Sequence, residues 1–508
     1  MPGTIVLRAG KPNDANRDYL PEAIKGSDMV VNENGNNSQA YPEKLTEHRG
    51  CLVEEGVEDV WYEYVPSTYD PTRSTPLVFS MHGGLMTGWG QAIYTSWTHV
   101  ADREGFICIF PNAQSKRMWM VEYDPRKIDE LTRPAPEGIP TLNRPTGEVG
   151  DFHDVKAVLA LLSLMKEKYN IDEGRVFMQG MSMGNLMTDQ VARYCGQVFA
   201  AAAGSGCPTG SCLLYTPDGT VINQGGALDF WQSRLEHDKT PPNYDEDDQT
   251  VVLNNIKYWR QVNGAEGLPQ IRILGEKNLA FFKGKKANVT LMDVRNRDHG
   301  QTFDDAEMVW DYMFSGVRKN EDGSLTHSDP VCENSGDRFA IAIAEHAVRA
   351  WVNNKVVSIE AETLRWEKLK YHGLNGDQIV RGSYLCVPLS FIAEVFDARL
   401  DLLENGAAAR LTLSDGRTFQ FAEGCIGCVA DNRVEAMLCE ALYRHDRLYI
   451  SLEWFCRFAY NLQVSEFDNV MYITDHYAQI SRYTSWLLQD ILLDNPHFME
   501  YKDGRSDE

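Results

Sequence analysis

The sequence predicts an α/β protein: a mostly parallel sheet, covered by helices on both faces, followed by a smaller α+β domain built from two repeats. Three observations support this prediction. Short apolar runs alternate with stretches of helical period from about residue 60 to residue 316. A polar, turn-rich segment follows at 317–337, and two similar stretches recur beyond it. Strands that alternate with helices form a mainly parallel sheet that is buried on both faces.

The first domain is expected at 51–316, after a polar N-terminal extension at 1–50. Its expected strands cover residues 76–82, 106–110, 175–179, 227–235 and 289–294. Its expected helices cover residues 154–169, 185–195, 251–264 and 304–314. Two long irregular stretches, 113–150 and 204–226, interrupt this order. Because loops beyond the strand ends of an α/β sheet form its ligand crevice, we expect these stretches to be functional.

The segment 317–337 is expected to be a linker into a second domain at 338–508. The stretches 384–413 and 447–474 can be superposed so that Val387 aligns with Ile450 and Leu389 with Leu452. Each copy is predicted to contain a strand, a short amphipathic helix, and a further strand or hairpin. Two weak copies indicate a duplicated small domain. The stretch "SRYTSWLLQDILLDNP" near the end predicts a closing helix.

Charge and hydropathy exclude several classes of partner. Asp plus Glu number 73 against 49 Lys plus Arg, so the net charge is −24. Such a surface repels nucleic acid and anionic membranes. No apolar run reaches the length of about 18 residues that a membrane span needs. The start, "MPGTIVLRAGKPNDANRDYL", lacks the features of a signal peptide, which predicts either a cytosolic protein or one whose signal has been removed.

The eleven cysteines are scattered along the chain and do not form the even, regularly spaced set of a disulfide framework. Two pairs lie close in sequence, Cys207 with Cys212 and Cys425 with Cys428. A zinc site would need a second pair or histidines at ligand spacing, and neither accompanies them. We therefore predict no metal site and expect free thiols at these positions.

Ser182 is the candidate nucleophile. It lies between Gly180 and Gly184 in a G-x-S-x-G motif, after an apolar strand and before a helical pattern. This is the context of a nucleophile elbow, a turn so sharp that residues two before and two after the serine crowd each other. The backbone N–H of Met183 would then point toward a forming oxyanion. The alternative is a glycine-rich loop that leads into a helix.

The general base and the acid are expected later in the chain, in the order Ser, Asp, His. His299 lies in a loop after an apolar strand and before a helix, where it can reach the serine. Asp238 follows another strand end and can accept the Nδ1 proton of the histidine. Glu236 and Asp245 are rival acids, and a plain surface loop is the alternative for His299.

Two further features complete the predicted site. The "HGG" that ends with Gly84 follows an early strand, so the N–H of Gly84 is the expected second oxyanion donor. Methionine and tryptophan side chains near the motif loops predict an apolar acyl-binding wall that suits an aryl or flexible apolar group. These residues are Met86, Met118, Trp119, Met120, Met181 and Met183, and the alternative is that they belong to the core.

Residues 76–315 resemble the α/β-hydrolase esterases that are related to polyhydroxybutyrate depolymerases and feruloyl esterases. The matching stretches are "PLVFSMHGG", "ADREGFICIFPNA", Trp119, "DVKAVLALLSLMKEKYNIDEGRVFMQGMSMGN" and "DHG". The resemblance implies a Ser182–Asp238–His299 triad, the Gly84 and Met183 oxyanion donors, and no cofactor. The sequence departs from the family at "LEHDKTPP", where relatives show a Gly-Thr-x-Asp-like turn, and in its longer insert 113–150.

Residues 350–475 are similar to the small repeated module found beside copper amine oxidases and on many bacterial surface proteins. "YLCVPLSFIAEVFDARLDL" and "RLYISLEWFCRFAYNLQV" carry this resemblance. It implies no copper, and a binding or packing appendage that contacts a polymer or cell surface. The expected function is a serine carboxylesterase that acts on a small-molecule or polymeric ester of aryl, feruloyl or polyester type. The alternatives are a peptidase of the same fold and a non-catalytic binding protein. The sequence indicates no oligomeric state.

Overall fold

The computed structural model describes residue 5 and residues 45–134, 141–239, 248–369 and 378–495. The chain divides into two compact units. The first unit contains the chain up to Pro269 and the segment Phe281–Ser335, and the second contains Gln270–Ala280 and the chain from Gly336. A segment that lies inside the expected first domain, 51–316, therefore belongs to the second unit. The first unit in turn includes most of the expected linker 317–337.

The first unit is built on a mixed sheet whose strands follow the order β1-β2-β4-β3-β5-β6-β7-β10. These strands are β1 (Thr46–Gly50), β2 (Asp59–Tyr64), β3 (Thr75–Met81), β4 (Ile107–Pro111), β5 (Ile171–Met181), β6 (Ala201–Ser205), β7 (Asp229–Leu235) and β10 (Val289–Val294). Strand β2 pairs antiparallel with β1 and β4, and every pair from β4 to β10 is parallel. The mostly parallel sheet confirms the predicted fold class.

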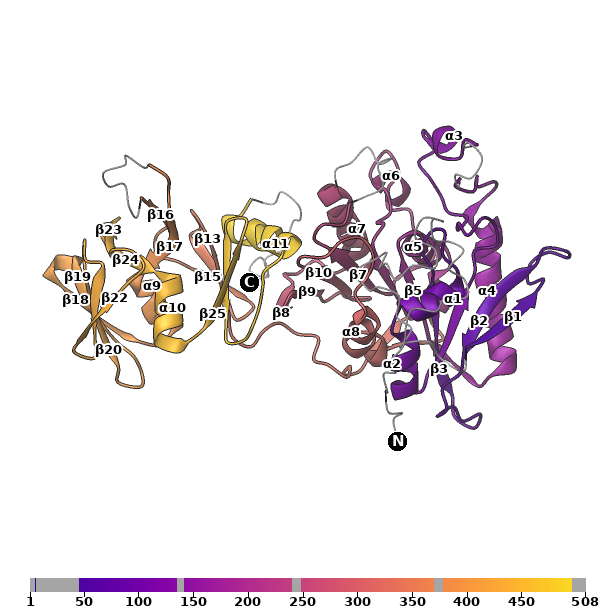
Figure 1. The fold of residues 1–508 in the computed structure, drawn as a ribbon, viewed down its shortest axis with the longest axis horizontal. Helices are drawn as coiled ribbons and strands as arrows, with labels where there is room; N and C mark the ends of the chain where they lie inside the picture. The colour runs from indigo at the N-terminus through magenta and orange to yellow at the C-terminus, as the bar shows by residue number, and fades with distance from the viewer. Residues whose placement is uncertain (1–4, 6–44, 135–140, 240–247, 370–377, 496–508) are drawn as a thin grey trace, which may run out of the picture. The chain divides into compact units, whose positions relative to one another are not determined.

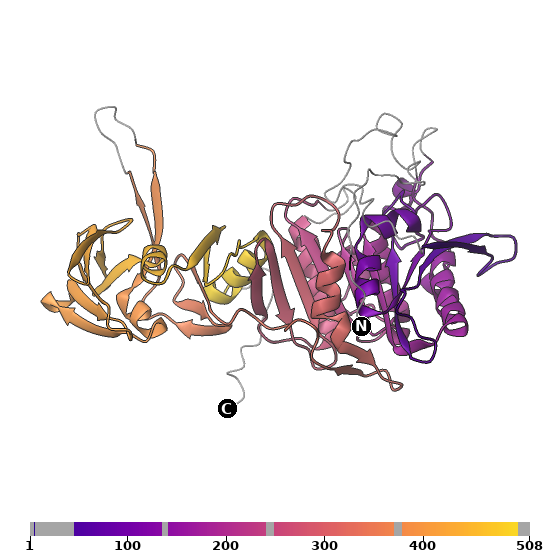
Figure 2. The same ribbon diagram turned by 60° about the horizontal axis from the view of Figure 1, so that its bottom comes forward.

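Helices lie on both faces of this sheet (Figure 1, Figure 2). They are α1 (Gly88–Tyr94), α2 (Trp97–Glu104), α3 (Ile128–Leu131), α4 (His153–Lys168), α5 (Met183–Cys195), α6 (Ser211–Leu214), α7 (Asp248–Asn263) and α8 (Asp305–Tyr312). Central strands such as β3 and β4 are buried along their whole length or nearly so, because helices exclude water from both sides. A short hairpin of β11 (Val317–Lys319) and β12 (Leu325–His327) closes the unit.

Most of the elements expected from the sequence are present. The strand at 289–294 has the expected bounds, and the helices near 154–169 and 185–195 differ from α4 and α5 by one or two residues. The end of the expected N-terminal extension forms strand β1, which pairs with β2. The rest of that extension, except Ile5 and Leu45, lies outside the described residues.

The second unit consists of small antiparallel sheets and short helices. Its strands are β8 (Gln270–Leu274), most of β9 (Lys277–Phe282), β13 (Ala340–Ala344), β14 (Arg349–Val352), β15 (Lys355–Ser358), β16 (Leu364–Lys368), β17 (Gly382–Pro388), β18 (Arg399–Leu403), β19 (Ala408–Thr412), β20 (Thr418–Ala422), β21 (Gly427–Ala430), β22 (Arg433–Ala436), β23 (Leu442–Arg444), β24 (Arg447–Ser451), β25 (Gln463–Phe467) and β26 (Val470–Thr474). Its helices are α9 (Leu389–Val395), α10 (Leu452–Tyr460) and the closing α11 (Arg482–Leu493).

The two repeats of the second unit meet at their first strands. Strand β17 runs directly into α9, and β24 runs directly into α10. The two strands pair antiparallel, with Val387 opposite Ile450. These are the residues that the superposition of the two copies placed in equivalent positions, so the copies are related by a local two-fold arrangement. Both side chains lie in the apolar core of the unit.

The strand pair β8–β9 is held inside the second unit by hydrogen bonds to residues far along the chain. The N–H of Asp337 donates to the carbonyl of Ile271 at 2.8 Å, and the N–H of Gln479 donates to the carbonyl of Gly275 at 2.7 Å. The side chain of Asn278 donates to the carbonyl of Gln479 at 2.9 Å.

Within the described residues, no helix combines the length and the apolarity that a membrane span requires.

Candidate active site

Ser182 occupies a sharp turn between the end of β5 and the start of α5. Its backbone has φ 55° and ψ −120°, a conformation that costs an L-residue on the order of 1–3 kcal/mol. A Cβ on Gly180 would lie 2.0 Å from the carbonyl oxygen of Gly184, and one on Gly184 would lie 2.2 Å from that of Met81. Only glycine therefore fits on either side of the serine, as the elbow interpretation of the motif requires.

The structure brings Ser182, His299 and Asp238 together in one chain of contacts. Nε2 of His299 lies 2.9 Å from Oγ of Ser182, and Nδ1 lies 2.7 Å from Oδ1 of Asp238. Asp238 follows β7 and His299 follows β10, and these parallel strands are neighbours in the sheet. Their carboxyl ends therefore meet at one edge. The histidine ring is 45% exposed and the carboxylate is fully buried, so the base faces the substrate while the acid is shielded from water.

The rival acids lie elsewhere. Oε2 of Glu236 accepts a hydrogen bond of 2.6 Å from the backbone N–H of Asn296, and this contact joins the loops that follow β7 and β10. Asp245 lies outside the described residues. Among the described residues, Asp238 is the carboxylate that contacts the ring of His299.

Arg234, which the sequence did not single out, contacts Asp238 on the side away from His299. Nη1 of Arg234 donates to Oδ2 of Asp238 and Nη2 donates to its backbone carbonyl, both at 3.0 Å. Both side chains are completely buried. A buried charge is tolerated when it is paired and hydrogen-bonded. The guanidinium therefore compensates the buried carboxylate and fixes the oxygen that faces His299.

Gly206 lies against the triad. Its φ of 80° favours glycine, and a Cβ there would lie 3.2 Å from the N of Ser182 and 3.3 Å from Cε1 of His299. Gly206→Ala should lower kcat by about 10²-fold, because small misplacements of catalytic groups are costly. The matched control is Gly219→Ala: Gly219 has a φ of 83°, but a Cβ added there would have no neighbouring atom within 4 Å. Ester turnover by the two folded variants is the measurement. Equal losses in both would mean that backbone strain, not crowding of the triad, is the cause.

The N–H groups of Gly84 and Met183, the expected oxyanion donors, have no hydrogen-bond acceptor within the described part of the chain. The turn that carries Gly84 is held by His82, which is fully buried. Nδ1 of His82 bonds the carbonyl of Gly83 at 2.6 Å, while Nε2 accepts from the N–H of Ala113 at 2.9 Å. Burial lowers the pKa of His82 to about 4, so the ring is neutral and keeps both contacts near neutral pH.

A cavity of about 330 Å³ opens beside Ser182, in the first unit. Its lining residues are Gly84, Leu85, Met118, Glu122, Tyr123, Asp124, Arg126, Leu131, Leu142, Ser182, Met183, Leu186, Cys207, Gly210, Cys212 and Leu213. The long insert 113–150 contributes one wall and the stretch 204–226 another, so both irregular stretches surround the candidate site. The size falls within the range of small-molecule sites, about 300–1,000 Å³.

Of the apolar wall expected from the sequence, Met118 and Met183 line the cavity, whereas Met86, Trp119, Met120 and Met181 do not. Trp119 is 1% exposed, and its Nε1 donates to the carbonyl of His82 at 2.7 Å. The tryptophan therefore supports the turn that carries Gly84. Leucines that the sequence did not single out take the place of the missing side chains on the wall.

Cys207 is the nearest thiol to the candidate nucleophile, with Sγ 3.6 Å from Oγ of Ser182. Burial raises the pKa of Cys207 to about 11, which keeps the thiol protonated and a poor nucleophile. The eleven cysteines are free thiols. In the part of the chain that the structure describes, no three His, Cys, Asp or Glu side chains are grouped as metal ligands.

The first unit has the α/β-hydrolase fold. Its mostly parallel sheet carries the serine on a strand–turn–helix elbow, and the acid and the histidine follow in chain order.

Comparisons with known proteins give partial matches. No protein-family model matches the chain. A stretch of 135 residues is 27% identical to the bifunctional acetylxylan esterase/xylanase XynS20E of Neocallimastix patriciarum, covering 27% of this chain and 16% of that protein. A stretch of 169 residues is 27% identical to feruloyl esterase B of Thermothelomyces thermophilus, and it covers 31% of this chain and 50% of that protein. The chain thus spans half or less of the length of these curated relatives. Among solved structures, an acetyl xylan esterase from Aspergillus awamori is 17% identical with a TM-score of 0.39, covering 52% of this chain and 97% of that one.

Proposed function

We propose that the protein is a serine carboxylesterase that hydrolyses carboxylic esters. The single observation that carries this proposal is the contact chain from Oγ of Ser182 through His299 to the buried Asp238, at the mouth of an apolar cavity. The esterase names of the partial relatives support the same reaction class. The finer assignment, an ester with an aryl, feruloyl or polyester-like acyl group, rests on the apolar cavity and on the name of the related feruloyl esterase.

The reaction follows from the positions of the groups. Oγ of Ser182 attacks the ester carbonyl while Nε2 of His299 takes its proton, and Asp238 accepts the Nδ1 hydrogen bond of the resulting imidazolium. The N–H groups of Gly84 and Met183 bind the oxyanion. His299 then returns the proton to the departing alcohol, which leaves an acyl-enzyme. Water, activated by the same histidine, hydrolyses the acyl-enzyme and restores Ser182.

The second unit is proposed to be a binding or packing appendage, similar to the repeated module found beside copper amine oxidases. Every residue named in the mechanism belongs to the first unit. The appendage therefore has no assigned step in catalysis, and its proposed role is to hold the enzyme on a polymer or cell surface.

The test of the proposed function is hydrolysis of a panel of aryl, short-acyl and polymeric esters. A series of unblocked peptides is tested in parallel as alternative substrates. We expect p-nitrophenyl esters to be hydrolysed and to show a burst of p-nitrophenol if deacylation is the slower step. A wild-type protein that cleaves peptides but none of the esters would instead be a peptidase of the same fold. If the wild-type protein hydrolyses neither the esters nor the peptides, the proposed hydrolase activity is excluded.

A further inference from the structure

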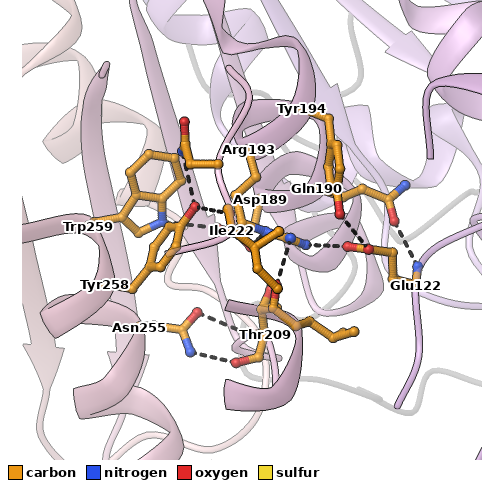
Figure 3. Close-up of polar contacts among 12 residues, drawn as sticks. Glu122, Asp189, Gln190, Arg193, Tyr194, Thr209, Ile222, Asn255, Tyr258 and Trp259 are labelled. Carbon is orange, nitrogen blue, oxygen red and sulfur yellow. Dashed lines mark hydrogen bonds and ion pairs between the residues drawn. The ribbon is translucent and has the colours of Figure 1, made fainter. Parts of the chain in front are cut away.

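Arg193 lies near the end of α5, the helix that begins directly after Ser182, and its side chain is 1% exposed. All three guanidinium nitrogens make hydrogen bonds (Figure 3). Nε donates to Oδ2 of Asp189 at 2.8 Å, Nη1 to the carbonyl of Leu213 at 3.1 Å, and Nη2 to Oε2 of Glu122 at 2.7 Å. Leu213 lies in α6 and Glu122 in the insert 113–150, and both line the cavity beside Ser182.

The insert is tied to α5 at more than one point. The N–H of Glu122 donates to Oε1 of Gln190 at 2.7 Å, and Nε2 of Gln190 donates to the carbonyl of Met120 at 3.2 Å. The hydroxyl of Tyr194 donates to Oε1 of Glu122 at 2.8 Å. Gln190, Arg193 and Tyr194 are spaced by three and four residues, so they share one face of the helix. That face holds the insert as a fixed wall.

The opposite wall is held through Asp189. Its Oδ2 accepts from Oγ1 of Thr209 at 2.7 Å, and its Oδ1 accepts from Nε1 of Trp259 at 2.9 Å. The amide of Asn255 exchanges hydrogen bonds with the backbone of Thr209. Thr209 lies between Cys207 and Gly210, which both line the cavity. Figure 3 shows Thr209 and Trp259 of α7 directed at Asp189, which in turn contacts Arg193.

The ion pairs of Arg193 with Asp189 and Glu122 restrict the movement of the cavity walls. Burial opposes the charged form of Arg193, but the carboxylates of Asp189 and Glu122 outweigh it and raise the pKa of the guanidinium. Removing one partner of a buried ion pair leaves an uncompensated charge, which is strongly unfavourable. The insert and α6 therefore cannot move away from α5 without breaking contacts to the guanidinium of Arg193.

We infer that Arg193 is a specificity-determining positioning residue: it fixes both walls of the cavity at a set distance from Ser182, so that the site selects esters whose apolar acyl chain reaches those walls. This inference rests on the proposed esterase function. An acetyl group is small and fills little of the cavity of about 330 Å³. A longer acyl chain extends between the two walls and gains contact only while they are held in place.

The test compares p-nitrophenyl octanoate with p-nitrophenyl acetate in the full-length protein and in Glu122→Gln. Arg193 and Tyr194 donate to different oxygens of Glu122, so in glutamine the amide NH2 group replaces one acceptor and faces a donor. We expect the ratio of kcat/KM for octanoate over acetate to fall about tenfold, a loss of the size seen for small changes in apolar pockets. The loss should appear mainly in the KM for octanoate.

Two further variants make the test specific. Tyr194→Phe keeps the Arg193–Glu122 pair and removes one hydrogen bond to the wall, so it should lower the same ratio by a smaller factor, about threefold. Glu130→Gln is the matched control, because Glu130 lies in α3 of the same insert but is not a lining residue. Its ratio should equal that of the wild type.

The outcomes separate this inference from the proposed function. A wild-type protein that hydrolyses neither ester would remove the proposed function and this inference with it. A wild-type protein that hydrolyses both, together with folded Glu122→Gln and Tyr194→Phe variants whose ratio is unchanged or raised, would overturn only the role of Arg193. If Glu122→Gln fails to fold, the ratio in Tyr194→Phe decides: a fall supports the inference, and no fall overturns it.

Discussion

Ser182→Ala should abolish ester hydrolysis, with a fall in kcat on the order of 10⁶, the size found when the serine of a triad is removed. The reason is that no other group at this position can form the acyl-enzyme. The nearest thiol, Cys207, lies 3.6 Å away, but burial raises its pKa to about 11. The measurements are turnover of p-nitrophenyl acetate and covalent labelling by a fluorophosphonate probe.

Cys207→Ala is the control for this experiment. The probe should label the wild type and Cys207→Ala, but not Ser182→Ala. Alanine has the same Cβ as serine, so Ser182→Ala adds no new steric conflict at a backbone φ of 55°. Labelling that survives in Ser182→Ala would place the nucleophile elsewhere, and labelling lost in Cys207→Ala would point to the thiol.

Asp238→Asn should lower kcat by a factor on the order of 10⁴, by analogy with the loss of the correct histidine tautomer in serine proteases. An amide nitrogen turned toward Nδ1 of His299 would favour a proton on Nε2, where the ring can no longer accept from Ser182. An asparagine would also leave Arg234 without its buried carboxylate partner, so the variant should lose stability. Turnover should therefore be measured on protein whose folding has been checked by circular dichroism.

Glu236→Gln is the matched control, because it makes the same chemical change two residues away. Its carboxylate bonds the N–H of Asn296 and not the ring of His299, so most of the activity should remain. A larger loss of turnover in Glu236→Gln than in Asp238→Asn would show that the acid has been assigned to the wrong residue.

The parts of the site that the sequence could predict are those fixed by local rules. The elbow requires glycine on both sides of Ser182, and these glycines are visible in the sequence as a motif. His299 and Asp238 each follow a strand end, so a correct assignment of the strands places them at the same edge of the sheet. The supporting arginines, Arg193 and Arg234, could not be found in this way. Each arginine pairs with a carboxylate four residues away, but the sequence does not show that these pairs are buried. Glu122 and the carbonyl of Leu213, the other partners of Arg193, lie far from it in the sequence.

The sequence also does not reveal strand β6 or the unit to which strand β8 belongs. Strand β6, Ala201–Ser205, is not predicted by the sequence, because its "AAAGS" lacks the β-branched and aromatic residues that are typical of strands. Small residues are needed there: a Cβ on Gly204 would lie 1.6 Å from Oδ1 of Asn185 at the start of α5. Strand β8 belongs to the second unit although neighbouring segments of the chain belong to the first, and no composition shift marks that change.

The strand pair β8–β9 has a consequence for the order in which the protein can be made. Its hydrogen-bond partners at residues 337 and 479 are synthesised later, the last of them roughly 200 residues after the pair itself. At about 5–20 residues per second, the ribosome needs on the order of 10–40 s to supply them. During that interval the pair lacks these hydrogen-bond partners. The second unit cannot be separated from the first as a C-terminal fragment, since release of the chain from Gly336 onward would leave two of its strands behind.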